Sequence, residues 1–327
     1  MTQIVSLIQA AMIFGTVILF GAVGETLTEK SGNLNLGVPG IMYLGGIASL
    51  IGVFYYEMST PTPSPFLCIL IALLCAIVAS MLGGLIYSFL TITLRANQNV
   101  TGLTLTIFGG GFANFFGGSL NKLAGGVGQI SVAVTSAAFR KDIAFTNGWG
   151  FIDDVLFDYG FLVYVAIVLA ILLNWFLNRT SKGLNLRAVG ENPATADAAG
   201  INVTLYKYLA TCIGAGISGL GGLYYVMDYM KGTWDSAGAI EGLGWLALSL
   251  VIFASWKPVR TIWGAYLFGL LSWLFFYLPG LSRRSMELFK MAPYVVTIVV
   301  LVAVAMRHRR EDQPPAKLGI PYFREER

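Results

Sequence analysis

The chain has 327 residues, of which 56% are hydrophobic and 12% are charged, and its formal net charge is +4. Its mean hydropathy is +0.71. Soluble domains carry roughly 25% charged residues, so this composition excludes an ordinary soluble protein. Several apolar stretches reach the roughly 20 residues that a helix needs to cross a bilayer. The sequence therefore predicts an all-α fold, a polytopic transmembrane helical bundle in which residues 1–327 form a single domain.

The apolar runs predict about nine membrane spans, with roughly eight to ten as the range. These spans are 4–24, 39–56, 66–94, 101–119, 159–178, 205–227, 241–256, 260–279 and 293–306. The first run lacks a basic segment before it and an A-x-A pattern after it, so we expect a transmembrane helix and not a cleaved signal peptide. The run 66–94 is long enough to tilt or break, and the glycine-rich run 101–119 is short, which leaves a re-entrant segment open.

Polar side chains that an apolar bundle would otherwise exclude mark a candidate substrate path. Amide groups can pair with nucleobase edges or ribose hydroxyls, and phenyl rings can stack on a base. Asparagine, threonine and glycine also join transmembrane helices to one another, so helix packing is the alternative interpretation of each residue. The candidates are Asn33, Asn35, Asn97, Gln98, Asn99, Thr104, Asn114 and Phe115.

The longest polar loop between two apolar runs has the sequence RTSKGLNLRAVGENPATADAAGINVTLYK at 179–207. Asn192 suits a helix N-cap, Pro193 suits the first helical position, and Gly200 suits the left-handed residue after a helix end. Between them lie mostly alanines, whose small side chains let another protein approach the backbone closely. We expect a short docking helix here, because loops beyond about 12–15 residues are uncommon unless functional. A merely solvated loop is the alternative.

The distribution of lysine and arginine predicts the orientation of the bundle. Most of the 21 basic residues fall on the same side as the 179–207 loop. Basic residues concentrate in cytoplasmic loops, so the loop and the C-terminus are predicted to face the cytoplasm. An odd number of helices then puts the N-terminus outside.

The sequence offers no energy source of its own. The predicted spans hold no Asp, Glu, Lys, Arg or His near their middles, which argues against proton coupling, although sodium sites built from backbone carbonyls remain open. The chain lacks the G-x-x-x-x-G-K-[ST] pattern that cradles ATP phosphates. Its three cysteines and single histidine show no metal-ligand spacing. We therefore predict no catalytic residue, no metal site and no cofactor in this chain.

Segments along nearly the whole chain resemble permease subunits of ABC importers in the branched-chain amino acid and ribose permease superfamily. Within it, the chain is most similar to the nucleoside branch, which works with a lipoprotein of the basic membrane protein type. The matching segments are GETLTEKSGNLNLGVPGIMYLGG (24–46), RANQNVTGLTLTIFGGGFANFFG (95–117), RAVGENPATADAAGINV (187–203), GLGWLALSLVIFASWKPVRTIWGAYLFG (242–269) and LGIPYFREER (318–327).

The resemblance implies a bacterial inner-membrane permease that imports a neutral solute by alternating access, with nucleosides as the expected substrate. It makes 179–207 a cytoplasmic coupling loop and 307–327 a short cytoplasmic tail. ATP and Mg²⁺ would be bound by a partner ATPase, and the residues implied to face it are Arg187, Gly190, Glu191, Asn192, Pro193, Ala198, Ala199 and Gly200.

Further partners implied by the resemblance are a substrate-binding lipoprotein and a second permease within the lipid bilayer, with no role for a nucleic acid polymer. The outer loop 118–158 carries mixed charges that suit the lipoprotein, or it is a plain solvated loop. Many relatives carry Glu where this chain has Pro39, which implies the second of two paralogous permeases and a heterodimer. Riboflavin, a sugar or a branched-chain amino acid are alternative substrates, and an ion-coupled carrier or a passive channel is the alternative class.

Overall fold

The computed structural model describes residues 2–123, 130–141, 155, 157–234, 238–278, 283–307 and 312–324. Within these residues the chain is almost entirely helical, with an isolated β-bridge between Ser131 and Thr233. The all-α prediction is confirmed.

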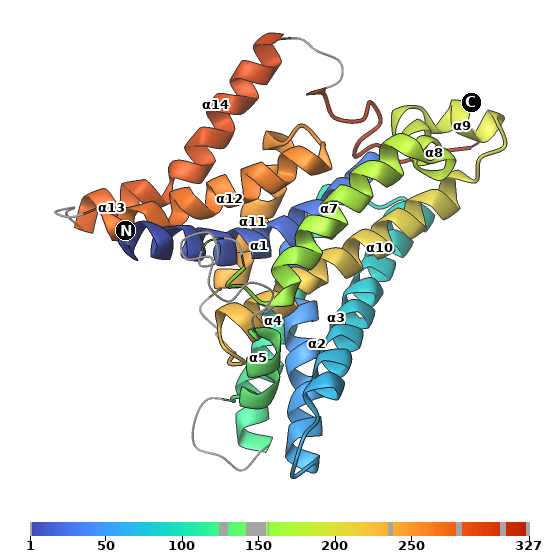
Figure 1. Ribbon diagram of the computed structural model, residues 1–327. Helices are drawn as coiled ribbons and strands as arrows, with labels where there is room; N and C mark the ends of the chain where they lie inside the picture. Colours follow the sequence, from blue (N-terminus) through green and yellow to red (C-terminus); the bar gives the residue numbers. More distant parts are fainter. Residues whose placement is uncertain are drawn as a thin grey trace.

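Figure 1 shows the helices of the bundle in chain order. They are α1 (Thr2–Lys30), α2 (Val38–Ser59), α3 (Pro65–Ser88) with the π-helical turn η1 (Phe89–Thr93), α4 (Gln98–Leu123), α5 (Ala133–Phe139), α7 (Phe161–Arg179), α8 (Ser181–Glu191), α9 (Pro193–Ala198), α10 (Val203–Tyr224) with the π-helical turn η2 (Tyr225–Tyr229), α11 (Ala239–Phe253), α12 (Pro258–Leu274) with the short η3 (Phe275–Tyr277), α13 (Arg283–Lys290) and α14 (Ala292–Arg307).

Seven helices in the described part are long and apolar enough to cross a membrane, and α11 and α14 contain shorter apolar helices. Each predicted span overlaps one of these helices. The run at 66–94 forms one long helix that ends in η1, and the glycine-rich run forms the regular helix α4.

The first helix differs from its predicted end. It continues past residue 24 to Lys30 and buries the carboxyl groups of Glu25 and Glu29 inside the bundle. The backbone N–H of Asn35 donates to Glu25 over 3.0 Å, and the Trp256 indole N–H donates to Glu29. Because both buried acids have hydrogen-bond partners inside the bundle, the helix can carry them. The predicted first span, 4–24, holds no acidic residue, and both acids lie in the part of α1 beyond it.

Helices α2 and α10 form the centre of the bundle. Helix α10 packs against α1, α2 and α3, and α2 also packs against α4 and α11. Close approach at these crossings depends on glycine: a Cβ on Gly222 would overlap the carbonyl oxygen of Met42, and a Cβ on Gly24 would overlap that of Gly214. Small residues drive helix association in membranes because they let backbones meet.

The connector between α1 and α2, residues 31–37, is non-helical backbone at the interior of the bundle. Gln98 accepts a hydrogen bond from the backbone N–H of Leu34 over 2.7 Å, and Tyr87 donates to the carbonyl of the same residue over 2.5 Å. Thr106 donates to the Leu36 carbonyl over 3.0 Å. Irregular backbone at this position needs such partners because no lipid group can supply them. The connector is thereby fixed beside α3, α4 and α10.

Candidate functional site

The short helix predicted within 179–207 is present as α9. The Asn192 side chain accepts a hydrogen bond from the backbone N–H of Thr195 over 3.1 Å, and Pro193 is the first helical residue. Gly200 follows the helix with a φ of +82°, which is the left-handed conformation expected of it. Asn202 then caps α10 by accepting from the N–H of Leu205 over 3.0 Å. The cap signals in the sequence are confirmed.

The residues implied to contact an ATPase divide into exposed and inward-facing groups. The exposed group is Glu191, Asn192, Ala198, Ala199 and Gly200. The remaining three are Arg187, which is half-buried, and Gly190 and Pro193, which are buried.

Gly190 packs inward because its Cα meets the connector after α1. A Cβ there would overlap the carbonyl oxygen of Lys30. A Cβ at Gly200, in contrast, would meet nothing within 4 Å. Among the residues implied to contact an ATPase, the accessible ones therefore flank α9: Glu191 and Asn192 before it, and Ala198, Ala199 and Gly200 at its end.

The C-terminal tail, described over 312–324, lies along this loop. The N–H of Lys317 donates to the carbonyl of Gly190 over 3.1 Å, and the N–H of Gly319 donates to the carbonyl of Gly32 over the same distance. The tail thus joins the coupling loop to the α1–α2 connector through backbone hydrogen bonds. Sequence reasoning placed the tail on the same side of the membrane but did not predict these contacts.

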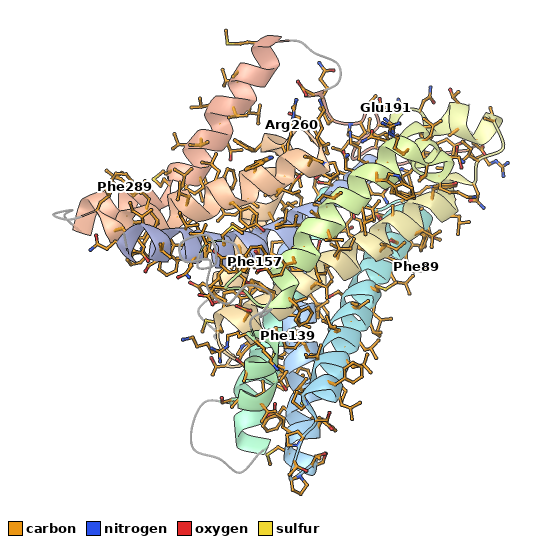
Figure 2. The ribbon with its side chains drawn as sticks, in the orientation of Figure 1. Phe89, Phe139, Phe157, Glu191, Arg260 and Phe289 are labelled. Carbon is orange, nitrogen blue, oxygen red and sulfur yellow. The ribbon has the colours of Figure 1, made fainter. Side chains whose placement is uncertain are left out.

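Ion pairs hold the tail at both ends. Asp312 accepts from Lys257 over 2.7 Å and from Arg260 over 2.9 Å, and the hydrogen bond from Lys257 holds the pKa of the Asp312 carboxyl below its usual 3.8. Figure 2 shows Arg260 and Glu191 toward the same end of the molecule. At the other end, Asp197 of α9 accepts from Tyr322 over 2.9 Å and from Arg324 over 3.1 Å.

The candidate substrate-path residues do not come together in one cavity. Asn33, Asn35 and Gln98 are buried at the connector. Asn35 accepts from the N–H of Gly37 over 2.9 Å, and Gln98 accepts from Leu34, so both side chains hold backbone in place.

The other candidates lie on α4 or just before it. Asn97, Asn99, Thr104 and Phe115 are exposed, and Asn97 caps the helix by accepting from the N–H of Val100 over 3.1 Å. Asn114 is half-buried, and its side-chain oxygen has no partner within the described structure. Helix α4 therefore exposes the polar side chains of Asn99 and Thr104 near its start, among apolar side chains that include Ile107, Phe108 and Phe115.

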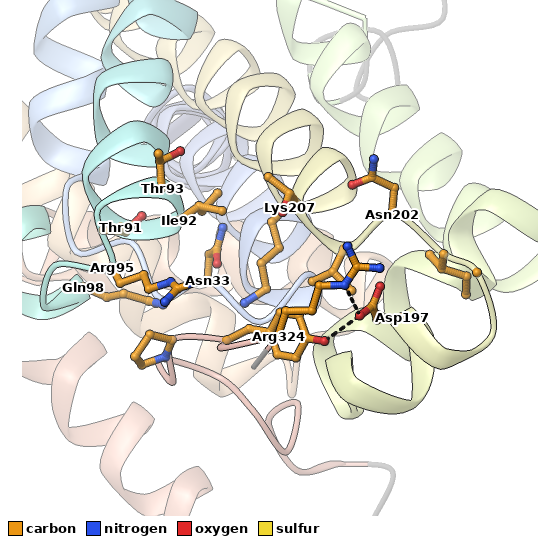
Figure 3. Close-up of a pocket in the computed structure, with 16 residues that line it drawn as sticks. Asn33, Thr91, Ile92, Thr93, Arg95, Gln98, Asp197, Asn202, Lys207 and Arg324 are labelled. Atoms are coloured by element: carbon orange, nitrogen blue, oxygen red, sulfur yellow. Dashed lines mark hydrogen bonds and ion pairs between the residues drawn. The ribbon is translucent and has the colours of Figure 1, made fainter. Parts of the chain in front are cut away.

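A polar cavity of about 490 Å³ lies between the connector, the ends of η1 and α9, the first turns of α4 and α10, and the tail. Figure 3 shows Asn33, Gln98, Lys207 and Arg324 around it. Its described lining is Asn33, Thr91, Ile92, Thr93, Arg95, Gln98, Asp197, Gly200, Ile201, Asn202, Val203, Thr204, Lys207, Pro321, Tyr322 and Arg324.

The described residues include no group of three His, Cys, Asp or Glu side chains that could hold a metal ion. Much of the outer loop 118–158, predicted to receive a lipoprotein, lies outside the described residues.

Comparisons with known proteins agree on one family. A family model described as branched-chain amino acid transport system / permease component matches residues 7–303. The chain is 30% identical to a guanosine ABC transporter permease protein of Bacillus subtilis, covering 99% of both chains. It is 30% identical to a nucleoside ABC transporter permease protein of Lactococcus lactis, covering 89% of both chains. It is 33% identical to a putative glucose ABC transporter permease protein of Haloferax volcanii, covering 81% of this chain and 75% of the relative.

No solved structure gives a significant match. The family match spans nearly all the apolar helices, and ABC permeases are transport components that work with a separate ATPase. The chain therefore belongs to the permease-component family of branched-chain amino acid transport systems and is a multi-pass subunit of the inner membrane.

Proposed function

We propose that the chain is the permease subunit of an ABC importer for nucleosides. The observation that carries this proposal is the similarity to the guanosine permease, which extends over 99% of both chains. The exposed face of α4 supports it, because the Asn99 amide, the Thr104 hydroxyl and the phenyl rings on the same helix suit a neutral solute with several hydrogen-bonding groups. The substrate would pass along this face by alternating access.

A sugar is the second candidate substrate. The relative with 33% identity is described as a putative glucose permease, and sugars share the uncharged, hydroxyl-rich character of nucleosides. The two substrates differ in the nucleobase, which needs a flat apolar surface. Phe108, Phe112 and Phe115 are exposed on α4 and provide one, and this favours the nucleoside.

The exposed end of α9 is proposed as the contact for the ATPase. In this arrangement ATP and Mg²⁺ are bound by the partner, and this chain performs no hydrolysis itself. The rigid capping of α9 and its attachment to the tail support this role, because a lever must transmit force without bending. The loop 179–207 and the tail 307–327 then face the cytoplasm.

A second, paralogous permease is the proposed partner within the membrane. Two nucleoside permease proteins of Lactococcus lactis are both similar to this chain, at 30% and 22% identity. Pro39 packs directly on α11, since a Cβ on Gly244 would lie 2.6 Å from the Cα of Pro39. A Glu at position 39, as many relatives carry, would need different packing there. This difference supports the assignment of the chain as the second of two paralogous permeases, and therefore a heterodimer. A substrate-binding lipoprotein completes the proposed complex.

Transport by the reconstituted complex tests the proposal. The permease, its paralogue, the ATPase and the lipoprotein are placed in proteoliposomes, and uptake of labelled guanosine and labelled glucose is measured with and without ATP. We expect ATP-dependent guanosine uptake that excess unlabelled guanosine, but not glucose, suppresses. Glucose uptake alone would establish the second candidate. Sodium-driven uptake by the single purified chain would contradict the importer proposal.

A further inference from the structure

Lys207, in the first turns of α10, is a buried cation without a counter-ion. Its side chain is 3% exposed, and no hydrogen bond or ion pair connects it to any described residue. In Figure 3 the side chain extends into the polar cavity. A buried, unpaired ammonium group is costly, because burial removes its hydration without replacing it. An anion or hydrogen-bond acceptor in the cavity beside Lys207 would offset this cost.

Asn33 provides a second unsatisfied group on the same cavity wall. The side chain is 0% exposed, and its amide nitrogen donates to the Thr211 hydroxyl over 2.9 Å. Its oxygen has no partner within the described structure. A buried amide oxygen needs a hydrogen-bond donor such as a hydroxyl group. Lys207 needs an acceptor and Asn33 needs a donor, so one ligand that satisfies both must carry both kinds of group.

The charge of the lining favours an anion. Lys207, Arg95 and Arg324 are the bases, and Asp197 is the acid. Asp197 pairs with Arg324, so the bases Lys207 and Arg95 outnumber the remaining acids of the described lining.

Helix dipoles both favour and oppose the binding of an anion in this cavity. The first residues of α4 and α10 line the cavity, and helix N-termini attract anions. The end of η1 also lines it and opposes this attraction, so the side-chain charges decide the sign.

Arg95 completes the wall in a strained conformation. Its φ of +57° is unusual for a residue with a side chain, and its guanidinium lies 4.5 Å above the ring of Phe323 in the tail. The tail thereby forms one side of the cavity. A volume of about 490 Å³ falls within the range of roughly 300–1,000 Å³ that small-molecule sites occupy.

We propose that this cavity binds a phosphate ester that carries a free hydroxyl group. The phosphate lies against Lys207 and Arg95, and the hydroxyl donates to the Asn33 oxygen. Two sources share this chemistry, a soluble sugar phosphate or nucleotide and the glycerol-phosphate headgroup of phosphatidylglycerol. The position on the cytoplasmic side rests on the proposed function, whereas binding itself does not. Ligand bound here joins α10, η1 and the tail, and so stiffens the support of α9.

Binding is measured with the full-length chain in nanodiscs of phosphatidylcholine, using AMP and inorganic phosphate as soluble probes in calorimetric titrations. We expect AMP to bind more tightly than phosphate, because only AMP offers hydroxyl groups to Asn33. Lys207→Gln should weaken AMP binding at least tenfold, and Lys207→Arg should restore most of it. Lys182→Gln, which changes an exposed lysine of α8 away from this cavity, should leave AMP binding unchanged.

Nanodiscs that contain phosphatidylglycerol distinguish the lipid headgroup from a soluble phosphate ester as the ligand. If the headgroup occupies the cavity, AMP binding falls in these nanodiscs, and Lys207→Gln loses copurifying phosphatidylglycerol that Lys182→Gln retains. Glu325 and Glu326 lie outside the described residues. A Glu325→Gln, Glu326→Gln variant therefore tests whether these carboxylates, and not a bound ligand, neutralise Lys207.

The proposal is overturned if Lys207→Gln changes neither the affinity for AMP nor the amount of copurifying phosphatidylglycerol. It is also overturned if AMP binds only to the Glu325→Gln, Glu326→Gln variant. Lys207→Gln and Lys207→Arg are both checked for a native unfolding midpoint. These assays need no ATPase and no lipoprotein, so their failure leaves the importer proposal intact, and failed guanosine uptake leaves the binding result intact.

Discussion

Single residues at the end of α9 determine what another protein can contact. Gly200 is exposed, adopts a left-handed backbone conformation and has open space around the position of a Cβ. A substitution there has two separable effects, a backbone cost common to all side chains and a steric effect that grows with their size. This separation makes Gly200 a suitable position for testing the docking surface.

Gly200→Ala and Gly200→Trp are expected to differ in coupling more than in stability. Both pay a backbone cost of about 1 kcal/mol for a positive φ. Only tryptophan should also block the ATPase, giving ATP hydrolysis by the complex that no longer drives uptake. The measurement is the ratio of guanosine transported to ATP hydrolysed in proteoliposomes. An unchanged ratio in the tryptophan variant would falsify the docking role of this surface.

Gln98 should matter for folding because its side-chain oxygen holds the connector. Gln98→Leu leaves the N–H of Leu34 buried without its partner, at a cost of about 1–3 kcal/mol in the free energy of unfolding. Asn99→Leu changes the exposed neighbouring amide and is expected to cost less than about 0.5 kcal/mol. Thermal or denaturant unfolding in detergent compares the two. Equal stability losses would contradict the role assigned to Gln98.

Elements differ in how far the sequence predicts them. The cap residues of α9 and the spans of the apolar helices follow from local pattern, so Asn192, Pro193 and Gly200 could be placed correctly from sequence. The inner part of α1 could not, because the burial of Glu29 depends on Trp256, which lies 227 residues away in the chain. The tail has no periodic pattern, and its contacts with Gly32 and Gly190 join distant segments. The candidate path residues lie in two different places, at the buried connector and on the exposed side of α4. The sequence did not predict this, because polarity alone does not distinguish a side chain that bonds to backbone from one that faces outward.

The tail attachment at Asp312 should depend on pH. Lys257 and Arg260 lower the pKa of this carboxyl, so the folded state binds its proton less readily than the unfolded chain does. The stabilisation by the ionised Asp312 carboxylate is therefore complete well above pH 3.8, the ordinary pKa of this group. It is lost as the pH falls through the lower pKa of the folded state.

Protease protection of the tail in the full-length chain measures this dependence. We expect protection to be constant from neutral pH down to about 5 and to fall only in stronger acid. Asp312→Asn should weaken protection already at neutral pH, with little further change on acidification. Glu287→Gln removes a different exposed ion pair, with Lys290, and serves as the control. A tail whose protection changes between pH 8 and 6 would show that another group controls it.

The whole bundle is organised around glycine-mediated crossings of α10 with α1 and α2. Gly222→Ala should destabilise the entire molecule by about 1–3 kcal/mol or more, because the added methyl overlaps backbone of α2 that cannot move alone. Gly111→Ala adds the same methyl on α4, where nothing lies within 4 Å, and should be neutral or slightly stabilising. The comparison is the unfolding midpoint and the yield of monodisperse protein in detergent. Similar behaviour of the two variants would show that these crossings do not control stability.

The course of the tail also has a practical consequence for how this protein is handled. Arg324, the last described residue, binds Asp197 of α9, so an affinity tag fused directly after Arg327 would begin a few residues from the surface proposed for the ATPase. The amino end lies far from α9 (Figure 1). Purification of an intact complex is therefore expected to succeed more readily with an amino-terminal tag, and activity lost on carboxyl-terminal tagging should return when the tag is cleaved.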